Sequence, residues 1–90
     1  MKTIWKFPLQ ITDRQPVVIP VGAKPLTVQL QGDKPCLWAL VDPGKAMRRT
    51  TIVIAIYGTG HPIEEGPGEY ISTFQADQFV LHAFNMGVQR

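Results

Sequence analysis

The sequence predicts an all-β domain: a small antiparallel barrel or a two-sheet sandwich of six to seven short strands, with no long helix. Three observations carry this prediction. Eight prolines and eight glycines interrupt the 90 residues at short intervals, as turns do in all-β chains. Apolar and polar residues alternate in several short stretches. No stretch of about eleven residues repeats apolar side chains at the i, i+3, i+4, i+7 spacing of an amphipathic helix.

The length and composition predict one globular domain over residues 1–90, because 90 residues leave no room for a second core. The net charge is +2 at pH 7, and the basic residues are scattered, so nucleic acid is not predicted as a partner. The single cysteine, Cys36, excludes an internal disulfide and favours a reducing compartment. The sequence shows neither a signal-peptide pattern nor an apolar run of the roughly 20 residues that span a membrane. We therefore expect a cytoplasmic protein with no membrane partner.

The first strand is predicted over residues 5–11, where apolar residues at odd positions alternate with other residues. Pro8 lies inside this stretch and cannot donate to a ladder, so the strand should lie at a sheet edge or break there. A turn at 13–16 leads to a short strand at 17–19, and a loop follows at 22–25.

Residues 26–30 alternate again and form the next predicted strand. The pair Gly32-Asp33 suits a type II′ connection, so this strand and residues 35–41 should form a hairpin. Asp42-Pro43-Gly44-Lys45 is a strong turn signal, and residues 42–49 have room for one helical turn.

The longest apolar run, residues 51–57, lies in a strand predicted over 50–57, and its composition predicts burial on both faces. A loop at 58–68 follows, because its glycines and prolines interrupt regular structure. The last two strands, 70–74 and 79–84, are predicted to form a hairpin around 75–78.

The loop Gly58-Thr59-Gly60-His61 is the first candidate site. Glycines let backbone N–H groups converge on an anion, and the threonine and histidine side chains add donors. The alternative is a tight turn whose glycines relieve strain. The candidate ligand-binding residues are the four loop residues together with aromatic and basic side chains from other segments: Gly58, Thr59, Gly60, His61, Tyr57, Trp38, Arg48 and Arg49.

The positions of the two arginines argue against one phosphate site that they share with the loop within a single subunit. Arg48 and Arg49 precede the strand 50–57 and Gly58 follows it, which places them about 25 Å apart at roughly 3.3 Å per residue. The arginines and the loop would meet only in an oligomer or through a loop that folds back.

No catalytic residue, metal ligand or cofactor is predicted. His61, His82 and Cys36 lie on separate segments and lack the spacing of metal ligands. Glu64-Glu65 could pair with His61 as an acid and a base, but no nucleophile with an activating base accompanies them. The alternative for these two glutamates is a solvated loop.

Four side chains on strands have both structural and functional interpretations. Cys36 lies in a strand beside Trp38, which predicts a buried, inert thiol. His82 is predicted to be a histidine with satisfied hydrogen bonds. Trp5 and Trp38 are candidates for the core, for an aromatic wall beside a ligand, or for an interface anchor.

Three segments carry a resemblance to a known family: KTIWKFPL at 2–9, PCLWALVDP at 35–43 and YGTGHPI at 57–63. Together they resemble a family of small proteins encoded mainly by bacteriophages and prophages, from Met1 to about Phe84. The resemblance implies a phage accessory protein in the host bacterial cytoplasm and implies no particular activity.

The expected function is that of a phage-encoded accessory binding protein that interferes with a host defence factor. It would hold either a small nucleotide-like ligand or a host protein. The alternative is a virion structural or assembly protein, and a small hydrolase ranks last. We also expect a homo-oligomer, because edge strands pair readily and a 90-residue chain has little core to cover its apolar residues.

Overall fold

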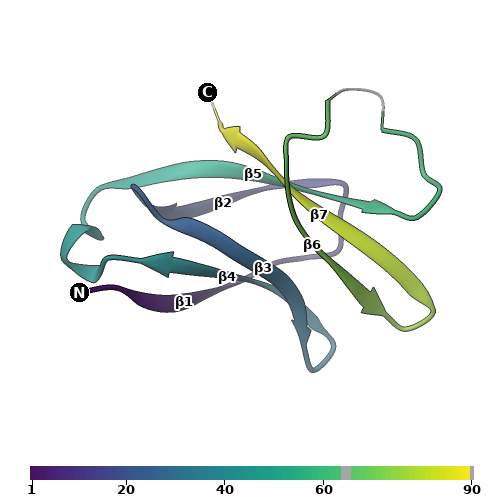
Figure 1. Cartoon of the computed structure of the whole chain (residues 1–90), viewed down its shortest axis with the longest axis horizontal. Helices are drawn as coiled ribbons and strands as arrows, with labels where there is room; N and C mark the ends of the chain where they lie inside the picture. The colour runs from purple at the N-terminus through teal and green to yellow at the C-terminus, as the bar shows by residue number, and fades with distance from the viewer. Residues whose placement is uncertain (64–65, 90) are drawn as a thin grey trace.

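A computed structural model of the chain describes residues 1–63 and 66–89. In this part of the chain, β-strands form two antiparallel sheets that pack face to face (Figure 1). The strands are β1 (Thr3–Pro8), β2 (Arg14–Pro20), β3 (Lys24–Gln31), β4 (Lys34–Val41), β5 (Arg49–Gly58), β6 (Glu69–Ala76) and β7 (Phe79–Val88). The predicted all-β sandwich is confirmed. The barrel alternative is wrong, because the strands divide into two separate sheets.

The strand order is β1-β4-β3 in one sheet and β2-β5-β7-β6 in the other. The expected edge position of the strand that contains Pro8 is confirmed, since β1 pairs with β4 alone. The predicted hairpin at Gly32-Asp33 joins β3 to β4, and Gly32 has a φ of 63°, as a type II′ turn requires at its first central position. A second hairpin joins β6 to β7 at Asp77-Gln78.

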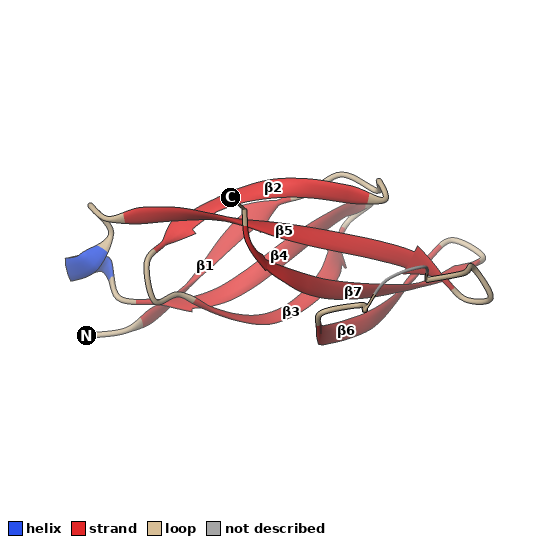
Figure 2. Cartoon of the chain, turned by 90° about the horizontal axis from the view of Figure 1, so that it is seen from above, coloured by secondary structure: helices blue, strands red, loops and turns tan. Residues whose placement is uncertain are grey.

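A single turn of 3-10 helix, η1 (Pro43–Lys45), lies between β4 and β5. It falls within residues 42–49, where the sequence left room for one helical turn. The Asp42 side chain caps it, since Oδ1 accepts a hydrogen bond of 3.0 Å from the Gly44 backbone N–H. Figure 2 shows η1 at the end of the molecule where the N-terminus lies. Within the described residues, no helix has the length and apolar character needed to cross a membrane.

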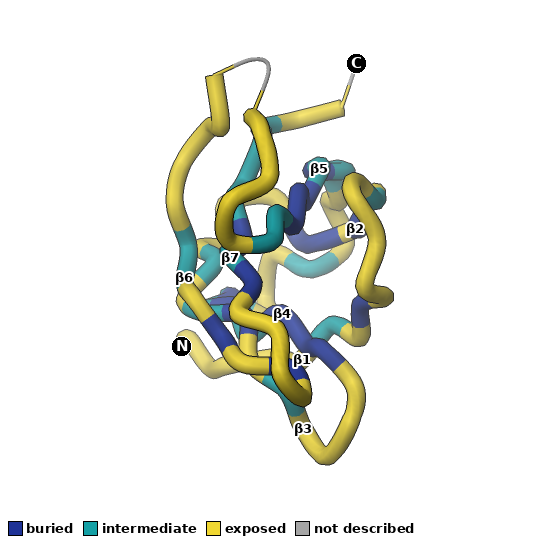
Figure 3. The backbone as a smooth tube through the Cα atoms, turned by 90° about the vertical axis from the view of Figure 1, so that its right-hand side faces the viewer, coloured by how far each residue is buried: buried dark blue, intermediate teal, exposed yellow. Residues whose placement is uncertain are grey.

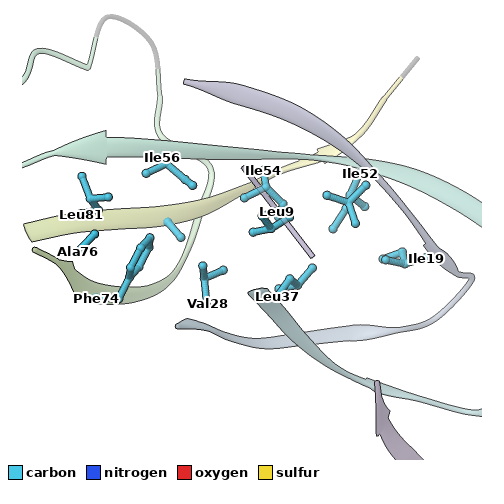
Figure 4. Close-up of a cluster of buried hydrophobic side chains, with 12 residues drawn as sticks. Leu9, Ile19, Val28, Leu37, Ile52, Ile54, Ile56, Phe74, Ala76 and Leu81 are labelled. Carbon is cyan, nitrogen blue, oxygen red and sulfur yellow. The ribbon is translucent and has the colours of Figure 1, made fainter. Parts of the chain in front are cut away.

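The core lies between the two sheets and is built from inward-facing residues of alternating positions (Figure 4). Leu37 of β4, Val28 of β3 and Ile54 of β5 are fully buried. The inward-facing cluster consists of Leu9, Val17, Ile19, Val28, Leu37, Ile52, Ile54, Ile56, Phe74, Ala76, Leu81 and Ala83. This alternation is the expected consequence of a pleated strand with one face against a core.

The prediction that the run 51–57 is buried on both faces is wrong for part of its outer face. Ile52, Ile54 and Ile56 are buried, and so is Ala55 on the opposite face, whereas Val53 and Tyr57 on that face are only half-buried. A two-layer sandwich has no third layer to cover the outside of a sheet. Figure 3 shows that the buried residues lie within the strands and that the loops are exposed.

One side of the sandwich is closed by a polar clasp between β3 and β6. The Ser72 hydroxyl accepts a hydrogen bond from the Val28 N–H at 2.8 Å and donates one to the Val28 carbonyl at 2.8 Å. Both groups belong to the edge of β3 that faces away from β4. Ser72 therefore satisfies the backbone of a fully buried residue across the gap between the sheets.

The other side is bordered by β1 and β2, and prolines occupy the outward edge of β2. The Asp13 carbonyl accepts a hydrogen bond from the Ile56 N–H of β5, and the Val21 N–H donates one to the carbonyl of Arg48, the residue before β5. The odd-numbered positions of β2 therefore bond toward β5. Antiparallel pairing alternates, so residues at even positions turn their backbone groups to the open edge. Pro16 and Pro20 hold two of these positions and remove two N–H donors there.

Candidate functional site

The loop Gly58–His61 forms a tight turn. The His61 N–H donates to the Gly58 carbonyl at 3.1 Å, and Gly60 has a φ of 87°, a conformation that favours glycine. The Thr59 N–H donates to the Val80 carbonyl at 3.1 Å. Two backbone donors of the loop are therefore engaged within the fold, and the geometry is that of the tight-turn alternative.

Three other candidate residues lie far from this turn. Arg48 and Arg49 lie where β5 begins, and Gly58 lies where it ends, so the expected separation within one subunit is confirmed (Figures 1 and 2). Trp38 lies on β4, in the other sheet, opposite Lys6 of β1 and Thr27 of β3. The structure thus separates Trp38 and both arginines from the loop.

Tyr57 and Thr59 instead join side chains that the sequence analysis did not place in a site. Phe84 of β7 contacts Tyr57 and Tyr70 edge to face, with ring centroids 5.7 Å and 5.6 Å apart. In the strand register, Phe84 lies opposite Tyr70, and His82 lies opposite both Tyr57 and Thr73. These side chains share the outer face of the four-stranded sheet. We call this surface the aromatic face, and it consists of Tyr57, Thr59, Tyr70, Thr73, His82 and Phe84.

A chain of hydrogen bonds links the polar groups of the aromatic face. The Tyr70 and Thr73 hydroxyls are 2.7 Å apart. Thr73 Oγ1 lies 3.0 Å from His82 Nδ1, and His82 Nε2 lies 2.7 Å from Thr59 Oγ1. Thr59 Oγ1 also donates to the Val80 carbonyl at 3.3 Å.

The last bond favours one direction for the whole chain, because a carbonyl oxygen only accepts. If the Thr59 hydroxyl donates to Val80, Thr59 accepts from Nε2–H of His82. The other ring nitrogen of a neutral histidine then accepts from Thr73, which in turn accepts from Tyr70. Every polar group of the chain is satisfied in this arrangement.

This direction has a chemical consequence. A hydroxyl 2.7 Å from an imidazole has the spacing of a nucleophile and its general base. A base, however, must present its lone pair to the hydroxyl proton, whereas in the direction that the Val80 bond favours Nε2 of His82 presents a proton to Thr59. In that direction the hydrogen bonds orient these side chains and do not activate Thr59 as a nucleophile.

The shared outward direction of Tyr70 and Thr73 could not be predicted from alternation, because the two residues are three positions apart, an odd spacing that normally places side chains on opposite faces. A register shift between Tyr70 and Ser72 is an irregularity that returns both side chains to one face. His82 and Phe84 follow normal alternation, and that signal was available in the sequence. The expectation of a hydrogen-bonded His82 is confirmed, since hydroxyls contact both of its ring nitrogens.

Cys36 is 3% exposed and unpaired with another cysteine, so the expected burial of its thiol is confirmed. In the part of the chain that the structure describes, no three His, Cys, Asp or Glu residues gather as metal ligands would. Glu64 and Glu65, the hypothetical acid partners of His61, lie outside the described residues.

Comparison with known proteins gives one positive finding. No curated protein matches the chain, and no solved structure matches it. A family model described as a domain of unknown function, DUF7352, matches residues 1–90. The chain belongs to the DUF7352 family.

Proposed function

We propose that this chain is a phage-encoded accessory protein that acts by binding, and that its aromatic face holds a folded host protein. The observation that carries the proposal is the cluster of Tyr57, Tyr70 and Phe84 on an outward sheet surface. Aromatic residues are enriched in the centres of protein interfaces. Tyr70 is 56% exposed and so is available to a partner.

The geometry favours a protein over a nucleotide-like ligand. A phosphate would need the donors of the Gly58–His61 turn together with Arg48 and Arg49, which lie at opposite ends of β5.

The aromatic face is also arranged in advance of binding. Edge-to-face contacts hold the rings, and the hydrogen-bond chain holds Tyr70, Thr73 and His82. Side chains that are already ordered lose less conformational entropy when a partner arrives. The partner would therefore meet a rigid surface with apolar rings and hydroxyl groups side by side.

Photo-crosslinking in the bacterial host tests the proposal. A photoreactive phenylalanine analogue replaces Tyr70 in one variant and Gln29 in the control. Gln29 is exposed and lies on β3, in the other sheet. We expect a discrete adduct with a host protein from position 70, and the same adduct to be absent or much weaker from position 29.

The adduct should disappear when Tyr57→Ala and Phe84→Ala are added to the Tyr70 variant. Crosslinks from position 70 to a second copy of this chain alone would assign the face to self-association and overturn the proposed host partner. Equal adducts from positions 29 and 70, or none from either, would also contradict the proposal.

A further inference from the structure

A second feature lies on the side of the sandwich that β1 and β2 border. There the sheets leave an open cleft of about 220 Å³, lined by β1, β2 and the segment that leads into β5. Trp5 and Phe7 of β1 form one wall. In the strand register, Trp5 lies opposite Ala39 of β4 and Phe7 lies opposite Leu37. Because Leu37 and Ala39 are buried, Trp5 and Phe7 lie on the inner face of the sheet.

The second wall and the rim come from elements that are distant in sequence. Val18, Ile19 and Pro20 of β2 line the opposite side, and Ile19 is 3% exposed. Ala46 reaches the cleft because η1 turns the chain immediately before it. Arg49 completes the lining and lies opposite Pro20 in the β2–β5 register.

The lining defines the chemistry of an occupant. Six of its seven residues are apolar, and the seventh is the cation Arg49. An apolar wall favours a hydrocarbon or a ring, and the positive charge of Arg49 favours a carboxylate, with which a guanidinium makes charge-assisted hydrogen bonds. A volume of about 220 Å³ exceeds the roughly 150 Å³ of an engineered cavity that binds benzene. The cleft therefore has room for one ring or a short chain.

The edges beside the cleft disfavour an extended peptide as the occupant. Strand addition depends on a row of backbone N–H and C=O groups. Pro16 and Pro20 remove two donors from the outward edge of β2. Pro8 removes another from the outward edge of β1, because the neighbouring Leu9 N–H donates to Pro35 of β4 and so marks the alternate positions as outward.

From the lining, the charge and the edges, we infer that this cleft is a binding site for a small amphipathic anion, an aromatic ring or short aliphatic chain that ends in one carboxylate. Its apolar body lies between Trp5 and Ile19, and its carboxylate meets Arg49. The site is separate from the aromatic face and does not depend on the function proposed for that face.

Two-dimensional ¹H–¹⁵N NMR of the full chain tests this inference, because each tryptophan gives its own indole N–H signal. Trp5 lines the cleft, whereas Trp38 pairs with Lys6 on the outward positions of β4, so Trp38 is an internal control. The probes are 4-phenylbutyrate and its neutral analogue 4-phenyl-1-butanol, and Trp38→Phe assigns the two signals.

We expect 4-phenylbutyrate to shift the Trp5 signal in a saturable way and to leave the Trp38 signal in place. The acid should bind about fivefold more tightly than the alcohol, since the Arg49 contact is charge-assisted but partly exposed to solvent. Arg49→Gln should remove that preference, Arg49→Lys should restore part of it, and Arg48→Gln should leave it intact. The dispersion of the variant spectra reports whether each variant is folded.

Several results would overturn the inference. These are a Trp5 signal that does not saturate at millimolar probe, equal affinity for the acid and the alcohol in the unmodified chain, or equal shifts of both indole signals. An equal loss on Arg48→Gln and Arg49→Gln would show that general surface charge, and not the cleft, attracts the acid.

Discussion

Gly68 occupies a backbone position that a side chain would disrupt. Its φ is 78°, and a Cβ atom there would lie 2.5 Å from the backbone oxygen of Asn85. Gly68→Ala therefore adds a steric clash to an unfavourable φ, and we expect the free energy of unfolding to fall by about 3 kcal/mol or more. Urea denaturation measures the change.

Gly22 provides the matched control for Gly68. Its φ is 83°, and a Cβ atom there would meet nothing within 4 Å. Gly22→Ala should cost only the conformational term of about 1–2 kcal/mol. Equal losses for the two variants would contradict the steric argument at Gly68.

The direction of the hydrogen-bond chain predicts the tautomer of His82. With the Thr59 hydroxyl directed to Val80, neutral His82 should carry its proton on Nε2. ¹⁵N NMR of the ring nitrogens at alkaline pH distinguishes the two tautomers. Thr59→Val removes the acceptor and should increase the share of the Nδ1–H form, whereas His61 should give the same signals in both proteins. A proton on Nδ1 in the unmodified chain would contradict the assigned direction.

At the scale of elements, the clasp between β3 and β6 depends on one hydroxyl. Ser72→Ala leaves the N–H and C=O of Val28 without their partner, and Val28 is fully buried. Each unsatisfied buried polar group costs about 1–3 kcal/mol, so the free energy of unfolding should fall by at least that amount. Amide exchange at Val28 should accelerate as well.

Gln29→Ala is the control for the clasp, because Gln29 lies on the same strand and is exposed. Its effect on the free energy of unfolding should stay within about 0.5 kcal/mol. If the two variants lose equal stability, or Val28 exchange is unchanged in Ser72→Ala, the clasp does not hold the sheets together as we argue.

At the scale of the whole molecule, stability rests on one thin layer of side chains between the sheets. Leu37 is 0% exposed, and Leu37→Ala should cost about 2–5 kcal/mol. That is a large part of the 5–15 kcal/mol that stabilises a typical domain, so thermal unfolding should shift strongly downward. Leu26, 40% exposed, is the control, and Leu26→Ala should cost clearly less. Similar losses for both variants would place the core elsewhere.

The expected homo-oligomer stays a prediction, and light scattering of the purified chain measures it directly. The edges of the two sheets and the aromatic face offer different routes to association. Tyr70→Glu would disrupt association through the aromatic face, because it places a charge among apolar rings. It should leave edge pairing unchanged. A monomer over the whole concentration range would contradict the expected oligomer.

The sequence by itself determined the local structure. Alternation predicted the strands because a pleated chain with one buried face needs apolar residues at every second position. Pro8 predicted an edge because proline lacks the N–H that an interior strand must donate. Gly32-Asp33 predicted a hairpin because the turn needs a positive φ. All of these depend on residues that are neighbours in the chain.

Only the tertiary structure decided which distant residues meet. Strand order brought Tyr70 and Thr73 to His82, and Ser72 to Val28, across as many as 44 positions. The irregularity between Tyr70 and Ser72 reverses the face on which each side chain lies, and a shift of one residue has this effect in any strand. Such pairings result from the summed packing of two whole sheets, so no single motif encodes the aromatic face or the cleft beside Arg49.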